Sequence, residues 1–308
     1  DTTRLNKIVE INEEDMYVIV ESGVTWAEMY EALSAKNLRT PFWGPFSGLK
    51  ATVGGSTSQN SLSMGTSAYG GSPESILCYD IVLPHGELLK TGSSAMKNSQ
   101  PFFRHYGPDL TGLFSGDAGA LGVKARITLR LIRHPSHTLT CSFGFKDYTS
   151  MSQGMAAAAR EQSVSSNWGL DPQLQQGQLG STTAKDAIQA AFAVLRTTRN
   201  PFEAIIQLGK MALAGKRFLT GFDYSAHFVV EGYSTAEVKS KLAQTRKAVG
   251  PHGTEIANTI PTVLGAMPFM ELYPILGPQG ERWVPMHGIV SFSKMQALHD
   301  SLMALYEE

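Results

Sequence analysis

The sequence predicts an α+β fold divided into two domains. The chain has 308 residues, more than one compact hydrophobic core usually serves. Short stretches of alternating hydrophobicity, typical of half-buried strands, alternate with stretches that have the spacing of amphipathic helices. They form two strand–helix–strand passages separated by an insertion, which favours plaited α+β sheets. The sequence changes character at His134-Pro135-Ser136, so we expect domains over residues 1–135 and 136–308.

The first domain contains several predicted strands and one well-marked helix. Thr25 and Glu28 form a capping box that begins the helix, and Asn37 suits the left-handed residue that ends it. A short helix is expected within residues 105–116. Alternating hydrophobicity predicts strands over Ile8–Ile11, Met16–Glu21, Ser75–Leu83, Glu87–Lys90 and Ala125–Ile132.

The second domain is predicted to mix helices with an antiparallel sheet. Ser234 and Glu237 form a second capping box, and Ser293 is expected to cap the last helix. Helices are further predicted over residues 149–161, 183–196 and 201–214. Strands are predicted over Leu139–Phe145, Ala226–Glu231, residues 254–258 and Trp283–Phe292.

Composition excludes several classes of partner. The 26 basic and 27 acidic side chains nearly cancel, which argues against nucleic acid or an anionic membrane as the main partner. No apolar run reaches the roughly 18–20 residues that span a bilayer, and the first residues lack a signal segment. Cys78 and Cys141 lie far apart in strand-like runs, which favours buried free thiols over a disulfide. We therefore expect a cytoplasmic protein that binds a small-molecule substrate without inserting into membranes; a homodimer and the electron acceptor stay open.

Two glycine-rich loops carry the strongest functional signal. The first, residues 51–70, places four glycines among small hydroxyl and amide side chains, and the second opens the stretch 116–131. Glycine has no Cβ, so it lets main-chain N–H groups approach a ligand closely and tolerates positive φ. Each loop lies next to a predicted strand. The pattern indicates main chain shaped around a large, phosphate-bearing cofactor.

The common motifs for nucleotide binding and hydrolysis are absent from the sequence. There is no G-x-G-x-x-G at a strand–helix junction, no G-x-x-x-x-G-K-[ST] and no G-x-S-x-G. His134 and His137 are separated by Pro135 and are joined by no carboxylate or cysteine cluster. They are therefore interpreted as polar linker residues and not as a metal pair.

A series of motifs in a fixed order resembles one flavoprotein family. The series covers residues 1–133 almost continuously and identifies them with the second subdomain of the PCMH-type FAD-binding domain, found in the vanillyl-alcohol oxidase/p-cresol methylhydroxylase flavoproteins. The motifs are G-P-x-x-G-x-x-A-T-V-G-G over residues 44–55, then Asn60, Gly65 and Tyr69-Gly70, the hairpin over 80–92, and the runs over 107–114 and 119–123.

The resemblance implies that the two loops bind FAD. The main-chain N–H groups of residues 52–55 would contact the pyrophosphate and ribityl chain, and Gly122 and Val123 would meet the flavin or adenine end. For Ser56, Asn60 and Tyr69, hydrogen bonds that only stabilise turns are the alternative. The implied cofactor-binding residues are Pro45, Thr52, Val53, Gly54, Gly55, Ser56, Ser58, Asn60, Gly65, Tyr69, Gly70, Gly119, Gly122 and Val123.

The second half resembles, more loosely, the substrate-binding cap domain of the same family. Residues 281–285 are similar to the stretch that lines the substrate side of the isoalloxazine ring. The resemblance implies catalytic roles for Arg282, which would bind a carboxylate or phenolate, and for His287, which would act as a base or hydrogen-bonding group. A surface position for Arg282 and a core position for His287 are the alternatives. No metal is implied.

The implied function is an FAD-dependent oxidoreductase that moves a hydride from a hydroxyl-bearing carbon to flavin N5. In phenol-oxidising members an Asp follows the Tyr-Gly pair, but this chain has Gly71 there. Together with Arg282, this favours a 2-hydroxy acid as substrate, and a phenolic alcohol of the 4-hydroxybenzyl type is the alternative.

Two further alternatives belong to other classes of protein. One is a flavin-free binding or scaffold protein with the same fold. The other is an NADPH-dependent reductase like the related cell-wall precursor enzymes. We also expect the chain to lack the family's first FAD subdomain and its C-terminal return to the FAD domain, as if truncated at both ends.

Overall fold

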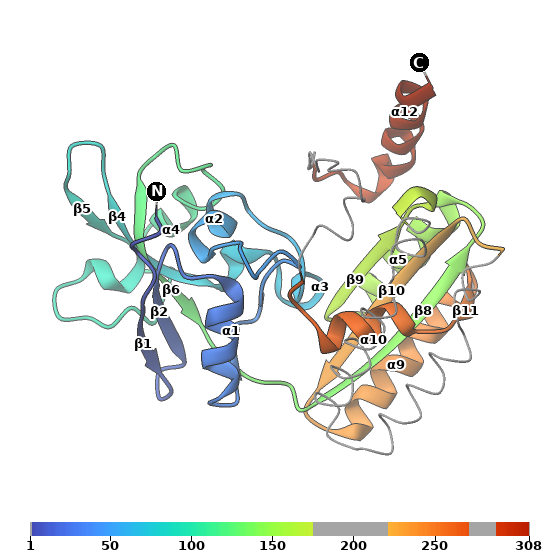
Figure 1. The fold of residues 1–308 in the computed structure, drawn as a ribbon, viewed down its shortest axis with the longest axis horizontal. Helices are drawn as coiled ribbons and strands as arrows, with labels where there is room; N and C mark the ends of the chain where they lie inside the picture. The colour runs from blue at the N-terminus through green and yellow to red at the C-terminus, as the bar shows by residue number, and fades with distance from the viewer. Residues whose placement is uncertain (1, 175–220, 271–287, 308) are drawn as a thin grey trace. The chain divides into compact units, whose positions relative to one another are not determined.

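The computed structural model describes residues 2–174, 221–270 and 288–307 (Figure 1). The chain divides into two compact units. The first runs from the N-terminus to Pro135 and also includes Phe269 and Met270, whereas the second contains the described residues from Ser136 to Pro268 and from residue 288 onward. Each unit is built around a sheet of its own.

The first unit contains a five-stranded antiparallel sheet in the order β1-β2-β6-β4-β5. Strand β6 comes last in the sequence but lies between β2 and β4, so the long segment between β2 and β4 connects strands that are not neighbours. A separate pair joins β3 (Leu38–Arg39) to β7 (Ile132–Arg133). The five strands are β1 (Ile8–Asn12), β2 (Tyr17–Glu21), β4 (Ile76–Val82), β5 (Leu88–Lys90) and β6 (Val123–Arg130).

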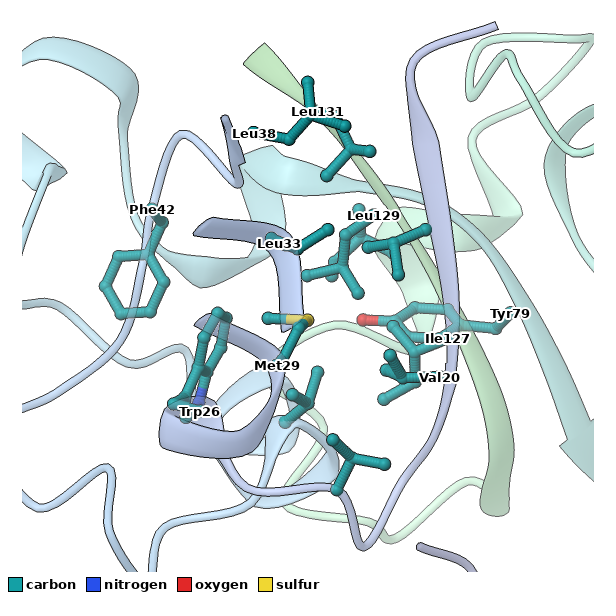
Figure 2. Close-up of a cluster of buried hydrophobic side chains, with 14 of the residues drawn as sticks. Val20, Trp26, Met29, Leu33, Leu38, Phe42, Tyr79, Ile127, Leu129 and Leu131 are labelled. Carbon is teal, nitrogen blue, oxygen red and sulfur yellow. The ribbon is translucent and has the colours of Figure 1, made fainter. Parts of the chain in front are cut away.

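Helix α1 (Trp26–Ser34) covers this sheet and closes the first hydrophobic core. Its buried residues recur with helical spacing, so Trp26, Met29 and Leu33 share one face. Figure 2 shows Met29 beside Tyr79 and Ile127 of the sheet. The other helical segments of this unit are short: α2 (Val53–Ser58), α3 (Thr66–Tyr69), η1 (Ser72–Ser75), η2 (Gly92–Ala95) and α4 (Leu110–Leu113).

The second unit contains a four-stranded antiparallel sheet in the order β11-β8-β10-β9. Its core gathers the alternate residues Cys141, Phe143 and Phe145 of β8 with apolar residues of α5 and α9. The strands are β8 (His137–Phe145), β9 (Ser166–Leu170), β10 (Tyr224–Gly232) and β11 (Thr254–Ile256). The helical segments are α5 (Tyr148–Arg160), α9 (Thr235–Val249), α10 (Thr259–Ala266), η4 (Phe292–Lys294) and α12 (Met295–Glu307).

Most predicted elements are present, and the α+β class with an antiparallel second sheet is confirmed. Strand β9 was not predicted. Its sequence SNWGL has little alternation, and it forms by pairing with β10. The predicted helices over 183–196 and 201–214 lie outside the described residues.

The C-terminal prediction is wrong in two respects. Gly288–Phe292, the described part of the strand predicted over Trp283–Phe292, has no strand structure, and Phe292 is the first residue of η4. Ser293 does not cap the last helix: it lies inside the turn η4, and α12 begins two residues later. The hydroxyl of Ser293 meets that of Ser291 at 3.3 Å, so it is turned to a neighbour in the turn. The start of α12 therefore follows the short turn η4, and the alternation of hydrophobic residues does not predict such a turn.

Two global properties complete the description. Within the described ranges, no helix combines the length and the apolar character that a membrane span requires. Cys78 and Cys141 are both buried and unbridged. Burial raises the pKa of the Cys141 thiol to about 12, so this thiol stays protonated and unreactive at neutral pH.

Candidate functional site

The first glycine loop contains the short helices α2 and α3, and Gly54 and Gly55 lie in the first turn of α2. Thr52 is the N-cap, and its Oγ1 accepts a hydrogen bond from the N–H of Gly55 at 3.1 Å. Small residues allow the helix to lie directly against the end of β2. There the N–H of Val53 donates to the oxygen of Val24 at 2.8 Å, and that of Gly54 donates to the oxygen of Ser22 at 2.9 Å. Gly54, which has no Cβ, therefore permits close packing of the helix on the end of the strand.

These contacts show where three N–H groups of the 52–55 turn are directed. The N–H groups of Val53, Gly54 and Gly55 all donate to acceptors within the protein. A backbone donor that is already bonded offers little to a ligand phosphate. The N–H groups of Val53, Gly54 and Gly55 are therefore engaged within the protein, and the contact of this turn with FAD stays a prediction.

The second glycine loop is a tightly folded segment before β6. Gly116, Ala118 and Gly119 have positive φ values of 68°, 52° and 76°, a conformation that a residue with a Cβ adopts only at a cost. Asp117 fixes the loop from within. Its carboxylate accepts hydrogen bonds from the N–H of Gly119 at 2.9 Å and from that of Leu121 at 3.4 Å.

The two loops lie side by side. The N–H of Gly116 donates to the oxygen of Thr57 at 2.9 Å, and the N–H of Ala118 donates to the oxygen of Ser58 at 2.8 Å. The end of α2 is therefore hydrogen-bonded to the second loop, although the two are about sixty residues apart in the sequence. This brings together the residues that the sequence nominated in separate motifs.

A buried ion pair lies in the second loop. Nζ of Lys124 is 2.5 Å from Oδ1 of Asp117, and each side chain is only 3% exposed. Burial acts to raise the pKa of Asp117, but hydrogen bonds from Lys124 and from the Gly119 N–H outweigh it and hold that pKa below its usual value. Nζ of Lys124 also lies 5.8 Å from the centre of the Tyr79 ring.

The predicted glycines differ in what a side chain would meet. A Cβ on Gly55 would approach only Oγ1 of Thr52, at 3.3 Å, and a Cβ on Gly119 would meet nothing within 4 Å. A Cβ on Gly54 would lie 2.6 Å from Cβ of Ser22, and one on Gly122 would lie 2.6 Å from a methyl group of Ile81. Gly55 and Gly119 thus have open faces, whereas Gly54 and Gly122 are required for packing.

Two other predicted glycines are explained by backbone conformation. Gly65 has φ of 91°, and a Cβ there would lie 2.4 Å from the oxygen of Pro41. Gly70 has φ of 82° and would meet the flexible Glu74 side chain. Both positions favour glycine whether or not a ligand is near.

The remaining predicted residues fall into different environments. Ser56 is buried, and its Oγ accepts a hydrogen bond of 2.7 Å from Nε1 of Trp26, which is a structural role. Asn60 is exposed with φ of 52°, and Val123, 55% exposed, begins β6. Pro45, Ser58 and Tyr69 are half-buried. Arg282 and His287, the expected catalytic residues, lie outside the described residues.

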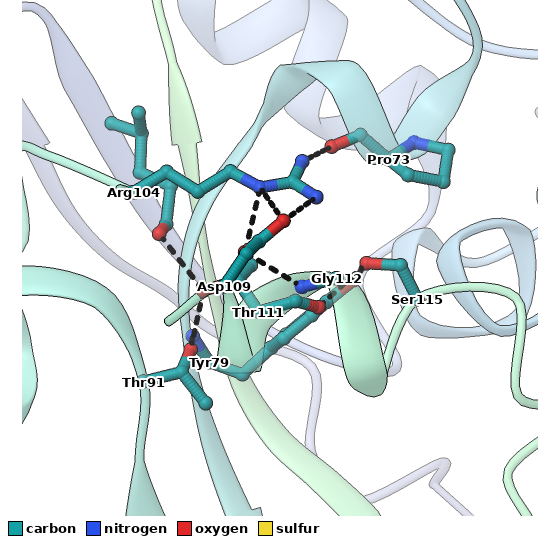
Figure 3. A network of polar contacts seen from close by, with 9 residues as sticks. Pro73, Tyr79, Thr91, Arg104, Asp109, Thr111, Gly112 and Ser115 are labelled. Atoms are coloured by element: carbon teal, nitrogen blue, oxygen red, sulfur yellow. Dashed lines mark hydrogen bonds and ion pairs between the residues drawn. The ribbon is translucent and has the colours of Figure 1, made fainter. Parts of the chain in front are cut away.

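A polar network that sequence motifs did not reveal supports α4 and the second loop (Figure 3). Arg104 donates to both carboxylate oxygens of Asp109 and, at 2.6 Å, to the oxygen of Pro73. The hydrogen bond from Arg104 and the N–H of Gly112 lower the pKa of Asp109. The sequence signal available was Asp109 itself, three residues before Gly112, in the position of a helix N-cap.

A threonine pair extends this network into the sheet. Oγ1 of Thr111 donates to Oγ1 of Thr91 at 2.8 Å, and Thr91 in turn accepts from the N–H of Tyr79. The Tyr79 hydroxyl lies 3.1 Å from Oγ of Ser115, directly before the second loop. Burial raises the pKa of Tyr79 to about 12, so its hydroxyl stays protonated. Hydrogen bonds therefore connect the residue that precedes the second loop to strand β4 of the sheet.

An aromatic socket in the first unit was also missed. The ring of Phe269 lies edge-on to Tyr30 and Trp43, with centroid separations of 5.6 and 6.3 Å. A Cβ on Gly48 would lie 2.3 Å from the Phe269 ring, and one on Gly44 would lie 2.9 Å from it. Two glycines of the turn-rich segment 40–50 thus make room for a residue far away in the sequence.

His134 and His137 of the linker form hydrogen bonds with neighbouring hydroxyl groups. Nε2 of His134 lies 3.0 Å from the Tyr30 hydroxyl, and Nδ1 of His137 lies 2.9 Å from Oγ of Ser136. In the part of the chain that the structure describes, no group of three or more His, Cys, Asp or Glu side chains could hold a metal ion.

Comparisons with known proteins bear on this site. A family model described as an FAD binding domain matches residues 1–92. The mitochondrial D-lactate dehydrogenase (cytochrome) of Arabidopsis thaliana is 34% identical over 145 residues, which are 46% of this chain and 24% of that protein. The glycolate oxidase subunit of Bacillus subtilis is 31% identical over 131 residues, which are 42% of this chain and 26% of that protein. This chain therefore matches only a part of each curated relative.

Solved structures agree on the fold over a larger span. The structure of p-cresol methylhydroxylase with bound substrate has a TM-score of 0.62 at 17% identity, covering 85% of this chain and 50% of that one. An alkyldihydroxyacetonephosphate synthase has a TM-score of 0.60 at 14% identity, covering 84% of this chain and 42% of that one. At such identities the likeness concerns the fold alone, and it confirms the PCMH-type α+β architecture.

Proposed function

From the premise that this chain is related to the FAD-linked oxidoreductases of the vanillyl-alcohol oxidase/p-cresol methylhydroxylase family, we propose that it forms part of an enzyme that oxidises a 2-hydroxy acid. The observation that carries the proposal is that the first glycine loop, which lies within the matched FAD-binding domain, is hydrogen-bonded to the second glycine loop. FAD, when bound, supplies the acceptor for the hydride that leaves the hydroxyl-bearing carbon.

The residues present fit FAD. Gly55 and Gly119 offer bare main chain with open space where a Cβ would stand. Exposed apolar side chains of Leu121 and Val123 flank the second loop and suit the flat face of an aromatic ring. The role of this chain is to hold both loops in one shape, so that the cofactor meets a surface that does not reorganise.

The substrate class rests on the relatives. Two of them are named for D-lactate and glycolate, both 2-hydroxy acids, and they match 46% and 42% of this chain at 34% and 31% identity. We propose that Arg282 binds the substrate carboxylate as a bidentate donor and that His287 hydrogen-bonds its hydroxyl. The likeness to p-cresol methylhydroxylase concerns the fold, so no observation favours a phenolic substrate over an acid.

The test is reduction of the bound flavin by candidate substrates. The full-length protein is purified, loaded with FAD and mixed anaerobically with D-lactate, L-lactate, glycolate or 4-hydroxybenzyl alcohol. We expect a 2-hydroxy acid to bleach the visible flavin band within the time of mixing and the phenolic alcohol to leave it unchanged. Bleaching by the phenolic alcohol alone would overturn the substrate class, and a protein that takes up no FAD would overturn the enzyme as a whole.

A matched pair of variants separates Arg282 from cofactor binding. Arg282→Met should raise KM for an acid substrate while the FAD content stays that of the wild type. Arg160→Met, at a described arginine in the last turn of α5, serves as the control for removing a guanidinium. An unchanged KM in Arg282→Met would return Arg282 to a surface role.

A further inference from the structure

The ion pair between Asp117 and Lys124 is unusual for its burial. Lysine and aspartate are almost never fully buried unless they are paired, and here both side chains are 97% shielded from solvent at a separation of 2.5 Å. Removing two charges from water is costly, and a pair of this kind is weak evidence for a role in stability alone. Its position suggests another role.

The pair joins the second glycine loop to the sheet. Lys124 belongs to β6 and lies opposite Ile81 of β4 in the ladder, so its backbone is fixed by the sheet. Asp117 lies at the other end of the loop and also accepts the N–H groups of Gly119 and Leu121. One carboxylate therefore receives a sheet lysine and two loop amides, which closes the segment between them into a single shape.

The pair also decides what the loop can offer a ligand. Main-chain N–H groups of a loop can bind an anion, but here the N–H groups of Gly119 and Leu121 donate to the carboxylate of Asp117. Among the described residues, Lys124 is the charged partner that acts on Asp117, so the two charges cancel locally. The loop therefore presents neutral main chain and the open face of Gly119, in a conformation that the ion pair maintains.

We propose that Asp117 and Lys124 are positioning residues that hold the loop over residues 116–122 in the conformation that binds FAD. The inference rests on the proposed function, since it concerns how the cofactor meets the loop. The pair acts through the loop backbone and does not contact the cofactor. Its loss loosens the loop locally, while the sheet and the packing of α1 on it stay in place.

Three variants test the pair. Lys124→Met removes the cation but keeps the apolar stem, and it leaves the Asp117 carboxylate buried and unpaired. Asp117→Asn combined with Lys124→Met removes both charges, while the Asn side-chain oxygen still accepts the shorter of the two loop hydrogen bonds, from the N–H of Gly119. Lys241→Met removes a lysine that pairs with Glu237 in the second unit and serves as the matched control.

Two readouts are measured on each full-length variant. The first is the Kd for FAD, by titration of the FAD-free protein. The second is hydrogen exchange at the amides of Gly119 and Leu121 without FAD. We expect Lys124→Met to weaken FAD binding about tenfold, or about 1.4 kcal/mol, with faster exchange confined to the loop. The double variant should recover most of the affinity, and Lys241→Met should match the wild type.

The outcomes separate this proposal from the proposed function. If Lys124→Met binds FAD like the wild type and its loop amides exchange no faster, the positioning role is overturned while FAD binding stands. If exchange rises equally throughout the first unit, the pair is a general stabiliser and the proposal is again overturned. If the wild type takes up no FAD, the proposed function fails, and the loop exchange alone still decides whether the pair shapes the loop.

Discussion

Gly54 and Gly55, two neighbouring residues of α2, lie in different environments. Gly54 lies in contact with Ser22 at the end of β2, and its N–H donates to the Ser22 oxygen. Gly55 points away from the protein and is exposed. A methyl group would therefore clash at the first position and project into open space at the second. The first prediction follows from this difference.

Gly54→Ala should destabilise the first unit by about 1–3 kcal/mol, because the added methyl group would overpack the contact of α2 with β2. Gly55→Ala should leave stability equal or slightly higher, since alanine is favoured over glycine inside a helix. Urea unfolding monitored by tryptophan fluorescence measures both. Equal effects from the two substitutions would contradict the packing assigned to Gly54.

His227 is a fully buried titratable residue in the second unit. Its Nδ1 lies 2.9 Å from Oγ of Ser142, and its Nε2 lies 3.2 Å from Oγ of Ser225. Both ring nitrogens are thus engaged by neutral hydroxyl groups, with no counter-ion among its hydrogen-bond partners. Burial lowers the pKa of His227 to about 3, so the folded protein holds this ring neutral.

The second prediction concerns pH. The folded-state pKa of His227 lies below the ordinary value of 6.5, so the unfolded chain takes up a proton first. Above about pH 6.5, His227 is neutral in both states and the free energy of unfolding does not depend on its protonation. As the pH falls from 6.5 toward 3, protonation of His227 in the unfolded chain lowers the free energy of unfolding by up to about 1.4 kcal/mol per pH unit. His227→Gln should flatten this slope, and His85→Gln, at an exposed hairpin position, should not. Parallel slopes for all three proteins in urea unfolding would exclude His227 as the titrating group.

Among the secondary-structure elements, α1 has a beginning that is defined by local hydrogen bonds. Oγ1 of Thr25 accepts from the N–H of Glu28 at 3.2 Å, while Oε2 of Glu28 accepts from the N–H of Thr25 at 2.9 Å. Thr25 also forms a backbone bridge with Thr52, the residue that caps α2. One position therefore organises the entry to the core helix and lies beside the first glycine loop.

The third prediction concerns this cap. Thr25→Ala should cost about 1 kcal/mol of unfolding free energy, because it leaves the Glu28 N–H without its side-chain acceptor. Thr25→Ser keeps the hydroxyl and should retain most of the stability. Urea unfolding of the two variants measures the difference. A serine variant as unstable as the alanine variant would mean that the methyl group matters here, and not the cap.

Elements with local signals were predicted well. The capping boxes of α1 and α9 are short-range patterns, and both helices begin where those patterns lie. At α9 the box is shifted: Glu237 accepts from the N–H of Tyr233, one residue before the cap. Strand β9 and the turn η4 have no comparable signal, because they depend on a neighbouring strand or on a short turn.

At the scale of the whole molecule, the described residues form two separate hydrophobic cores. The first gathers Ile127 and its neighbours between α1 and the five-stranded sheet. The second gathers Phe228 with residues of β8, α5 and α9. Since each unit has its own sheet and core, we propose that the units over 1–135 and 136–308 are domains that unfold separately.

The fourth prediction tests this division. Ile127→Ala removes fully buried apolar atoms from the first core and should cost that unit about 2–5 kcal/mol. Phe228→Ala should cost the second unit about 3–5 kcal/mol. Hydrogen exchange should show each loss in the amides of its own unit alone. Faster exchange across both units from either substitution would show that they unfold as one body.

Local sequence patterns were sufficient to predict the α+β class and the principal strands, because alternating apolar residues and capping residues act over short distances. The FAD-binding domain was predicted from the resemblance of several ordered motifs to one flavoprotein family, and those motifs include both glycine loops.

The role of each of those residues depends on how the chain packs in three dimensions. The joining of the two loops through Gly116 and Ala118, the open faces of Gly55 and Gly119, and the burial of Lys124 against Asp117 all depend on how the loops, α2 and the sheet pack in space. The physical reason is that the neighbours in the folded protein determine which acceptor an N–H group bonds and how much space a Cβ would have. A linear motif does not specify those neighbours.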